Sequence, residues 1–136
     1  MATQTQLRER FSLDIPAHMV EDAEVPVLAG RQRQGDLYLV PMKSGGTAGS
    51  QVPAAGVALI RGEALGNTHL LLPSPGVTYR PVVDQSAGEI VGMIDVADGA
   101  IAYFHHIEHG YVAMCPGSYL VRRQREQRDL IRLVVD

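Results

Sequence analysis

Short apolar runs alternate with turn-forming residues along most of the chain. From residue 37 onward the runs recur about every ten residues, and Gly, Pro, Asn, Asp and Ser separate most of them. They cover residues 37–40, 57–61, 68–72, 77–83, 90–96, 100–106, 111–114, 119–125 and 130–135. This spacing is typical of all-β folds. It predicts a single-domain small barrel or sandwich of about eight or nine short antiparallel strands.

Two of the turns predict hairpins between consecutive strands. Asp98-Gly99 separates two apolar runs, and Asp-Gly favours the tight turns that join paired antiparallel strands. Pro116-Gly117 separates the next two runs, and Pro-Gly suits the central positions of a type II turn. We therefore expect each turn to connect two neighbouring strands of one sheet.

The first 34 residues differ from the rest. Pro16 and Pro26 interrupt any long helix there, although Leu7–Phe11 can form a helical turn. We expect an extended N-terminal arm over residues 1–34, packed on its own domain or on a neighbouring subunit, and a β domain over residues 35–136.

Composition and charge exclude several classes of protein. The chain has 136 residues, with 12 Lys and Arg against 15 Asp and Glu, so its formal net charge is −3. A dedicated nucleic-acid-binding domain is usually basic, so no nucleic-acid partner is expected. The polar N-terminus lacks the apolar core of a signal peptide, and no apolar run is long enough to cross a bilayer. Cys115 is the single cysteine, so no disulfide can form within the chain. These features predict a cytoplasmic protein without a membrane partner or a disulfide.

Histidines are the most informative polar residues. Residues 105–109 read HHIEH, which places three imidazoles and a carboxylate together, and His69 lies upstream. Imidazole and carboxylate groups bind divalent transition metals. The candidate metal ligands are His69, His105, His109 and Glu108. The alternative is a structural or surface role in an exposed loop, and in that case no cofactor is required.

Arginines are concentrated near the C-terminus, where residues 122–132 contain five of them. Guanidinium groups pair with carboxylates and phosphates, so Arg122, Arg123 and Arg125 are candidates for an acidic-partner or subunit interface. Interspersed Glu126 and Asp129 favour ion pairs within or between subunits over contacts with RNA.

The histidine pattern resembles the cupins in part. Their first motif is Gly-x5-His-x-His followed by a Glu, and their second is Pro-x-Gly-x2-His. When His69 is aligned with the second histidine of the first motif, Asn67 falls at the first, and no histidine follows residues 116–119. The resemblance implies a cupin-like, jelly-roll topology but not cupin catalysis.

A second resemblance covers about residues 56–136. Residues 62–69, 106–110 and 116–126 resemble a set of small bacterial proteins of unassigned function, with the pattern Gly-Glu-Ala-Thr-Gly-His, His-x-Glu-His and Pro-Pro-Gly-x-Tyr-x-Val-x-Arg-Gln-Arg-Glu. This resemblance implies a shared β fold and no particular activity. Asn67 again departs from a histidine of the pattern.

Other catalytic signatures are missing from the sequence. It contains no Gly-x-Ser-x-Gly elbow and no phosphate-binding glycine loop, and Cys115 precedes a proline in an apolar run, as a small buried residue would. We therefore expect a non-enzymatic β module that self-associates as a homo-oligomer, partly through its arm, or scaffolds a partner, as phage-type or particle-forming structural proteins do. The alternative is a metal-binding, cupin-like protein or enzyme that uses the histidines and one divalent transition metal.

Overall fold

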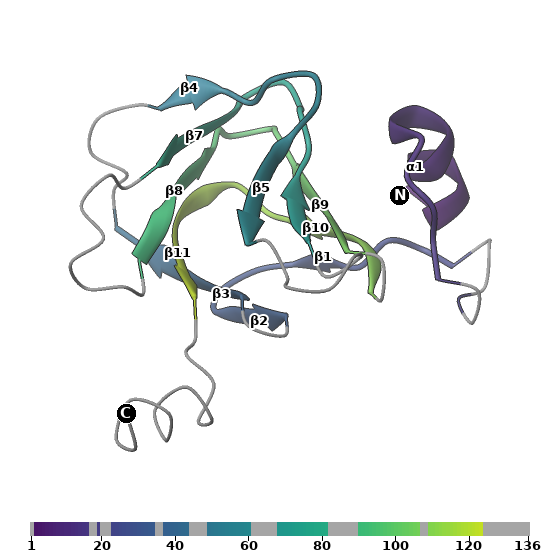
Figure 1. The fold of residues 1–136 in the computed structure, drawn as a ribbon. Helices are drawn as coiled ribbons and strands as arrows, with labels where there is room; N and C mark the ends of the chain where they lie inside the picture. Colours follow the sequence, from purple (N-terminus) through teal and green to yellow (C-terminus); the bar gives the residue numbers. More distant parts are fainter. Residues whose placement is uncertain are drawn as a thin grey trace, which may run out of the picture.

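The computed structural model describes residues 2–16, 19, 23–34, 37–43, 49–60, 68–81, 90–106 and 109–123. These residues form one helix and eleven strands, arranged as two sheets that face each other (Figure 1). The protein is therefore mostly β, as the apolar runs predict. The two sheets remain separate, so the fold is a sandwich and the alternative of a closed barrel is wrong.

One sheet has five strands and mixed pairing. Its order is β1 (Val27–Leu28), β10 (Gly110–Met114), β9 (Ala102–His106), β6 (His69–Leu71) and β5 (Val57–Ile60). Strand β1 pairs with β10 in parallel, whereas the other pairs are antiparallel. The expectation of purely antiparallel strands is therefore wrong at this edge, where the N-terminal segment supplies the additional strand.

The other sheet has six strands and is antiparallel throughout. Its order is β2 (Gln32–Gln34), β3 (Leu37–Met42), β11 (Gly117–Arg123), β8 (Ile90–Val96), β7 (Val77–Pro81) and β4 (Ser50–Gln51).

Both predicted hairpins are wrong, although both turns join consecutive strands. The turn at Asp98-Gly99 contains a hydrogen bond from the Ala100 N–H to the Ala97 carbonyl oxygen (2.9 Å), but it connects β8 to β9 in the opposite sheet. Pro116-Gly117 likewise leads from β10 to β11 across the sandwich. A tight turn reverses the chain locally, but it does not decide which sheet the next strand joins.

The core lies between the two sheets. Because side chains alternate along a strand, each sheet contributes every second residue to this layer. The fully buried members include Leu71, Ala102 and Met114 of the five-stranded sheet and Val77, Ile94 and Val121 of the six-stranded sheet. This layer holds the two sheets together by removing apolar surface from water.

The N-terminal segment, residues 2–16, covers the outer face of the five-stranded sheet. Its helix α1 (Gln4–Phe11) includes the predicted helical turn and lies beside β10, as Figure 1 shows in purple. The Thr3 side chain accepts a hydrogen bond from the Gln6 N–H, and the Gln6 side chain accepts one from the Thr3 N–H, so the helix begins with a capping box. The segment packs on its own domain in a second apolar cluster with Leu7, Val25, Leu72, Tyr111 and Ala113 at its centre.

The arm expected over residues 1–34 thus contains a helix and two short strands. No helix within the described residues is long and apolar enough to span a membrane.

Candidate histidine site

Two buried histidines lie next to each other where β6 begins and β9 ends. In these antiparallel strands Leu70 pairs with His105 and Leu71 with Phe104, so His69 and His106 project from the core-facing side of the sheet. Their ring centroids are 4.3 Å apart. Only 4% of His69 and 3% of His106 are exposed to solvent.

A third histidine extends this pair to the surface. His109 lies in the turn that joins β9 to β10, where its N–H donates to the His106 carbonyl oxygen (3.2 Å). Its ring centroid is 4.7 Å from that of His106. We call the residues His69, His106 and His109 the histidine row; it leads from the buried layer to solvent.

The buried end of the row contains a polar atom without a partner among the described residues. His69 Nδ1 is shielded from solvent and makes no hydrogen bond to any residue that the structure describes. An unsatisfied buried polar group typically costs about 1–3 kcal/mol of stability. Loss of solvation lowers the pKa of His69 from 6.5 to about 4, with a further contribution from the positive charges that His106 and His109 can carry. His69 is therefore neutral at physiological pH, which is the form that binds metals.

His105 has a different environment because it faces the N-terminal segment. Its Nε2–H donates to the Asp14 carbonyl oxygen (2.7 Å), and its ring lies 4.9 Å from that of Tyr111. Burial lowers the pKa of His105, and the hydrogen bond to the Asp14 backbone and the Asp14 charge partly oppose this. This histidine anchors the segment to the sheet.

The metal ligands predicted from the sequence are therefore not brought together. His69 and His105 lie on opposite faces of the five-stranded sheet, and Glu108 lies outside the described residues. The structure places His106, which the sequence-based set omits, beside His69 and His109. Because side chains alternate along a strand, the sequence places His105 and His106 on opposite faces of the sheet. Only the pairing of β6 with β9 shows which of the two lies on the same face as His69.

The rings of the row are stacked at a tilt, at 32° between His69 and His106 and 33° between His106 and His109. In this arrangement no three His, Cys, Asp or Glu side chains of the described residues are already placed to hold a metal ion. A shared ion would require the rings to rotate.

Two of the three arginines predicted for an interface lie on the six-stranded sheet, whereas β6 and β9, which carry His69 and His106, belong to the five-stranded sheet. Arg122 and Arg123 are exposed at the end of β11, whereas Arg125 lies outside the described residues. Arg122 is opposite Tyr38 and Arg123 is opposite Leu37 of β3.

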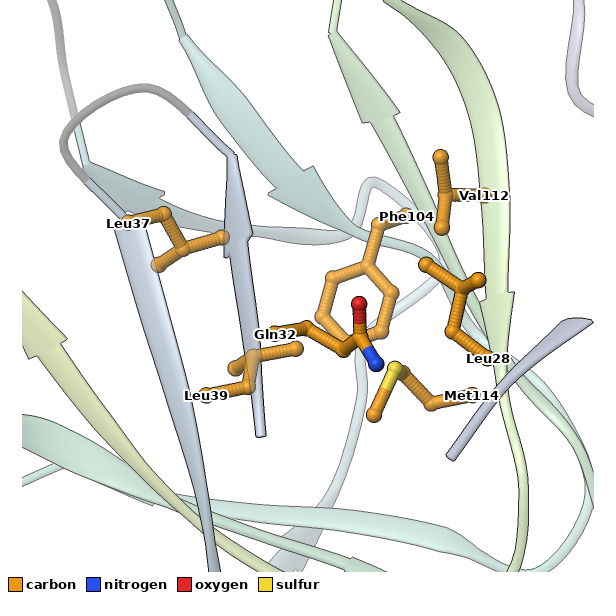
Figure 2. A pocket seen from close by; sticks show the side chains of 7 residues that line it. All are labelled: Leu28, Gln32, Leu37, Leu39, Phe104, Val112 and Met114. Atoms are coloured by element: carbon orange, nitrogen blue, oxygen red, sulfur yellow. The ribbon is translucent and has the colours of Figure 1, made fainter. Parts of the chain in front are cut away.

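A small apolar cavity lies between the two sheets, near the edge strands β1 and β2. Figure 2 shows it between residues of β2 and β3 on one side and residues of β1, β9 and β10 on the other. It is lined by Leu28, Gln32, Leu37, Leu39, Phe104, Val112 and Met114. Its volume is about 60 Å³, and the Gln32 amide, the one polar side chain among these described lining residues, donates to the Ala29 carbonyl oxygen. A cavity of this size and polarity is too small for most substrates.

The fold and the site define a mostly β sandwich protein with a histidine row at the end of two paired strands. Residues 33–124 match a protein family described as a domain of unknown function, DUF8820. Because the match spans well over half of the chain, the protein belongs to this family. No curated protein and no solved structure matches the chain.

Proposed function

We propose that this protein is a non-enzymatic β module that self-associates, and that two copies exchange their N-terminal segments. The observation that carries the proposal is that residues 2–16 cover an apolar sheet face through contacts that the same segment of a second copy can make equally well. Exchange of an identical element is a low-cost route to a dimer, because it reuses an interface that already exists. Phage-type or particle-forming structural proteins are one setting for such a module.

The contacts between segment and sheet are specific as well as apolar. The Gln4 side chain is buried, donates to the Tyr111 carbonyl oxygen (2.9 Å) and accepts from the Tyr111 N–H (2.8 Å). The Tyr111 hydroxyl donates to the Leu13 carbonyl oxygen (2.8 Å). Leu7, which is 2% exposed, fills the apolar cluster between these polar contacts. Such a combination fixes the position of the segment and supports exchange between copies in a single register.

Edge-to-edge pairing of the sheets is a less favourable route to assembly. The outer strands are short, with two residues in β1, three in β2, two in β4 and four in β5. Short edge strands offer few backbone groups to another chain. Among the described residues, the exposed large hydrophobic side chains are Val27 and Met42, each 37% exposed. The described surface therefore offers only a small apolar area for such pairing.

A complementation experiment tests the exchange. Leu7→Asp damages the segment, whereas Ala113→Arg damages the sheet face that the segment covers, because Ala113 is fully buried there. In a mixture, the intact segment of the Ala113→Arg chain can dock on the intact face of the Leu7→Asp chain. Glu9→Gln, on the exposed side of α1, is the matched control.

Size-exclusion chromatography with light scattering gives the readout. We expect the wild type and Glu9→Gln to form a dimer as concentration rises, each damaged variant to remain monomeric, and their mixture to form a heterodimer. A wild type that stays monomeric at every concentration contradicts the proposal, and so does a dimer that persists in both damaged variants.

A further inference from the structure

His105 is a titratable side chain buried in the interface between the five-stranded sheet and the N-terminal segment. It is 7% exposed, and its Nε2–H donates to the Asp14 carbonyl oxygen over 2.7 Å. Tyr111 of the neighbouring strand β10 contacts the His105 ring and donates through its hydroxyl to the Leu13 carbonyl oxygen. The imidazole therefore belongs to the contacts that hold the segment on the sheet, and self-association makes no use of the charge that it can acquire.

We infer that protonation of His105 releases the N-terminal segment from the sheet, so that mild acid uncovers the outer face of the five-stranded sheet. A neutral imidazole can donate to the Asp14 carbonyl oxygen without bringing a charge into the interface. An imidazolium in the same place is largely removed from water, which costs free energy unless an opposite charge compensates for it. Release of the segment gives water access to the charge, so the proton favours the released segment.

The groups around His105 compensate for this charge only in part. Loss of solvation lowers the pKa of His105, and the hydrogen bond to the Asp14 backbone and the Asp14 charge oppose the effect without cancelling it. The other titratable or charged groups that the structure describes around this contact are the guanidinium groups of Arg8 and Arg10, which are cations, and the Tyr111 hydroxyl, whose pKa is raised by burial.

The direction of the pH dependence follows from this difference. His105 has a pKa below 6.5 under the docked segment, whereas an exposed histidine titrates near 6.5. Docking of the segment is therefore fully retained above pH 6.5 and weakens as the pH falls below it. This inference concerns a single chain and does not depend on the proposed exchange of segments between two copies.

Hydrogen exchange measured by mass spectrometry between about pH 7.5 and pH 5 tests the release, on dilute full-length protein that light scattering shows to be monomeric. Protection factors, corrected for the intrinsic effect of pH on amide exchange, are compared for residues 2–16 and for the central strand β8. We expect protection of residues 2–16 to fall at least about threefold and at most about thirtyfold, because one proton changes an equilibrium by no more than about tenfold per pH unit below 6.5. Protection of β8 should stay higher than that of residues 2–16 at every pH, because β8 opens only when the protein unfolds.

Two variants separate the charge of His105 from its hydrogen bond. His105→Gln keeps a donor for the Asp14 carbonyl oxygen but cannot be protonated, so protection of residues 2–16 should change less than about twofold over the same pH range. Asp14→Asn keeps the backbone acceptor and removes the charge that stabilises the imidazolium, so its loss of protection should be at least as large as that of the wild type.

Four results overturn the inference. The first is protection of residues 2–16 that does not change with pH in the wild type, and the second is an equal fall in His105→Gln. The third is a smaller fall in Asp14→Asn than in the wild type, which means that the Asp14 charge does not act on His105. The fourth is equal protection of residues 2–16 and β8 at acidic pH, which means that the whole protein unfolds before the segment is released.

Discussion

Acidification should destabilise the protein through His69. The side chain is 4% exposed, and its pKa is lowered from 6.5 to about 4 in the folded protein. Between these two pKa values the unfolded chain binds a proton that the folded protein does not bind. Stability is therefore fully retained above pH 6.5 and is lost as the pH falls toward 4.

The size of this effect follows from the difference between the two pKa values. One pKa unit corresponds to about 1.4 kcal/mol, so the fall from 6.5 to about 4 amounts to at most about 3.5 kcal/mol. That is a large part of the stability of a typical domain. The lowered pKa of His105 acts in the same direction, so the wild-type protein alone does not isolate His69.

The contribution of His69 is isolated by comparing how the free energy of unfolding depends on pH in the wild type and in variants. Urea denaturation at a series of pH values between 7 and 4 gives the free energy of unfolding of the wild type, His69→Asn and His105→Asn. Between pH 6.5 and 4, the free energy of unfolding of the wild type should fall by up to about 3.5 kcal/mol more than that of His69→Asn, whatever the stability of this variant at neutral pH. Parallel curves for the wild type and His69→Asn refute the argument, because they mean that burial does not oppose the charging of His69.

Three further predictions concern the free energy of unfolding, measured by urea denaturation at neutral pH. Gln4→Ala should cost about 2–3 kcal/mol, because it leaves the buried N–H and carbonyl group of Tyr111 without their side-chain partner; a loss below about 0.5 kcal/mol contradicts this. Gly110→Ala should cost more than Gly99→Ala, since both glycines have positive φ (+70° and +80°) but a Cβ meets close neighbours only at Gly110. Equal losses of stability in the two variants mean that the strain of a positive φ, and not the neighbours of the Cβ, determines the cost. Gly92→Ala should cost several kcal/mol, because its Cβ would overlap the Tyr79 ring and the neighbouring backbone; a stability close to that of the wild type means that Tyr79 moves aside.

The sequence predicts most strands because burial on alternate positions is a local property. Eight of the apolar runs correspond to strands from β3 to β11, whereas β1, β2 and β4 have two or three residues each and no such pattern. The choice of sheet is not local. Asp98-Gly99 produces a turn as predicted, yet β8 and β9 lie in different sheets: β8 pairs with β7 and β11, and β9 pairs with β6 and β10.

The candidate site could be predicted only in part for the same reason. The HHIEH segment identifies the region, and strand alternation indicates that His105 and His106 face opposite ways. Which of them faces His69 depends on the pairing of β6 with β9, which brings together residues more than thirty positions apart. The partner of His105, the Asp14 carbonyl oxygen, is a backbone atom and leaves no signal in the side-chain pattern.

The two neighbouring histidines at the end of β9 connect the two faces of the five-stranded sheet. His105 holds the N-terminal segment on the outer face, and His106 stands in the histidine row on the inner face. Tyr111 binds both Gln4 and Leu13 of the segment from the paired strand β10, opposite His105. A shift of β9 along β10 would therefore disturb the segment and the row together, whereas a change in one side chain disturbs one face.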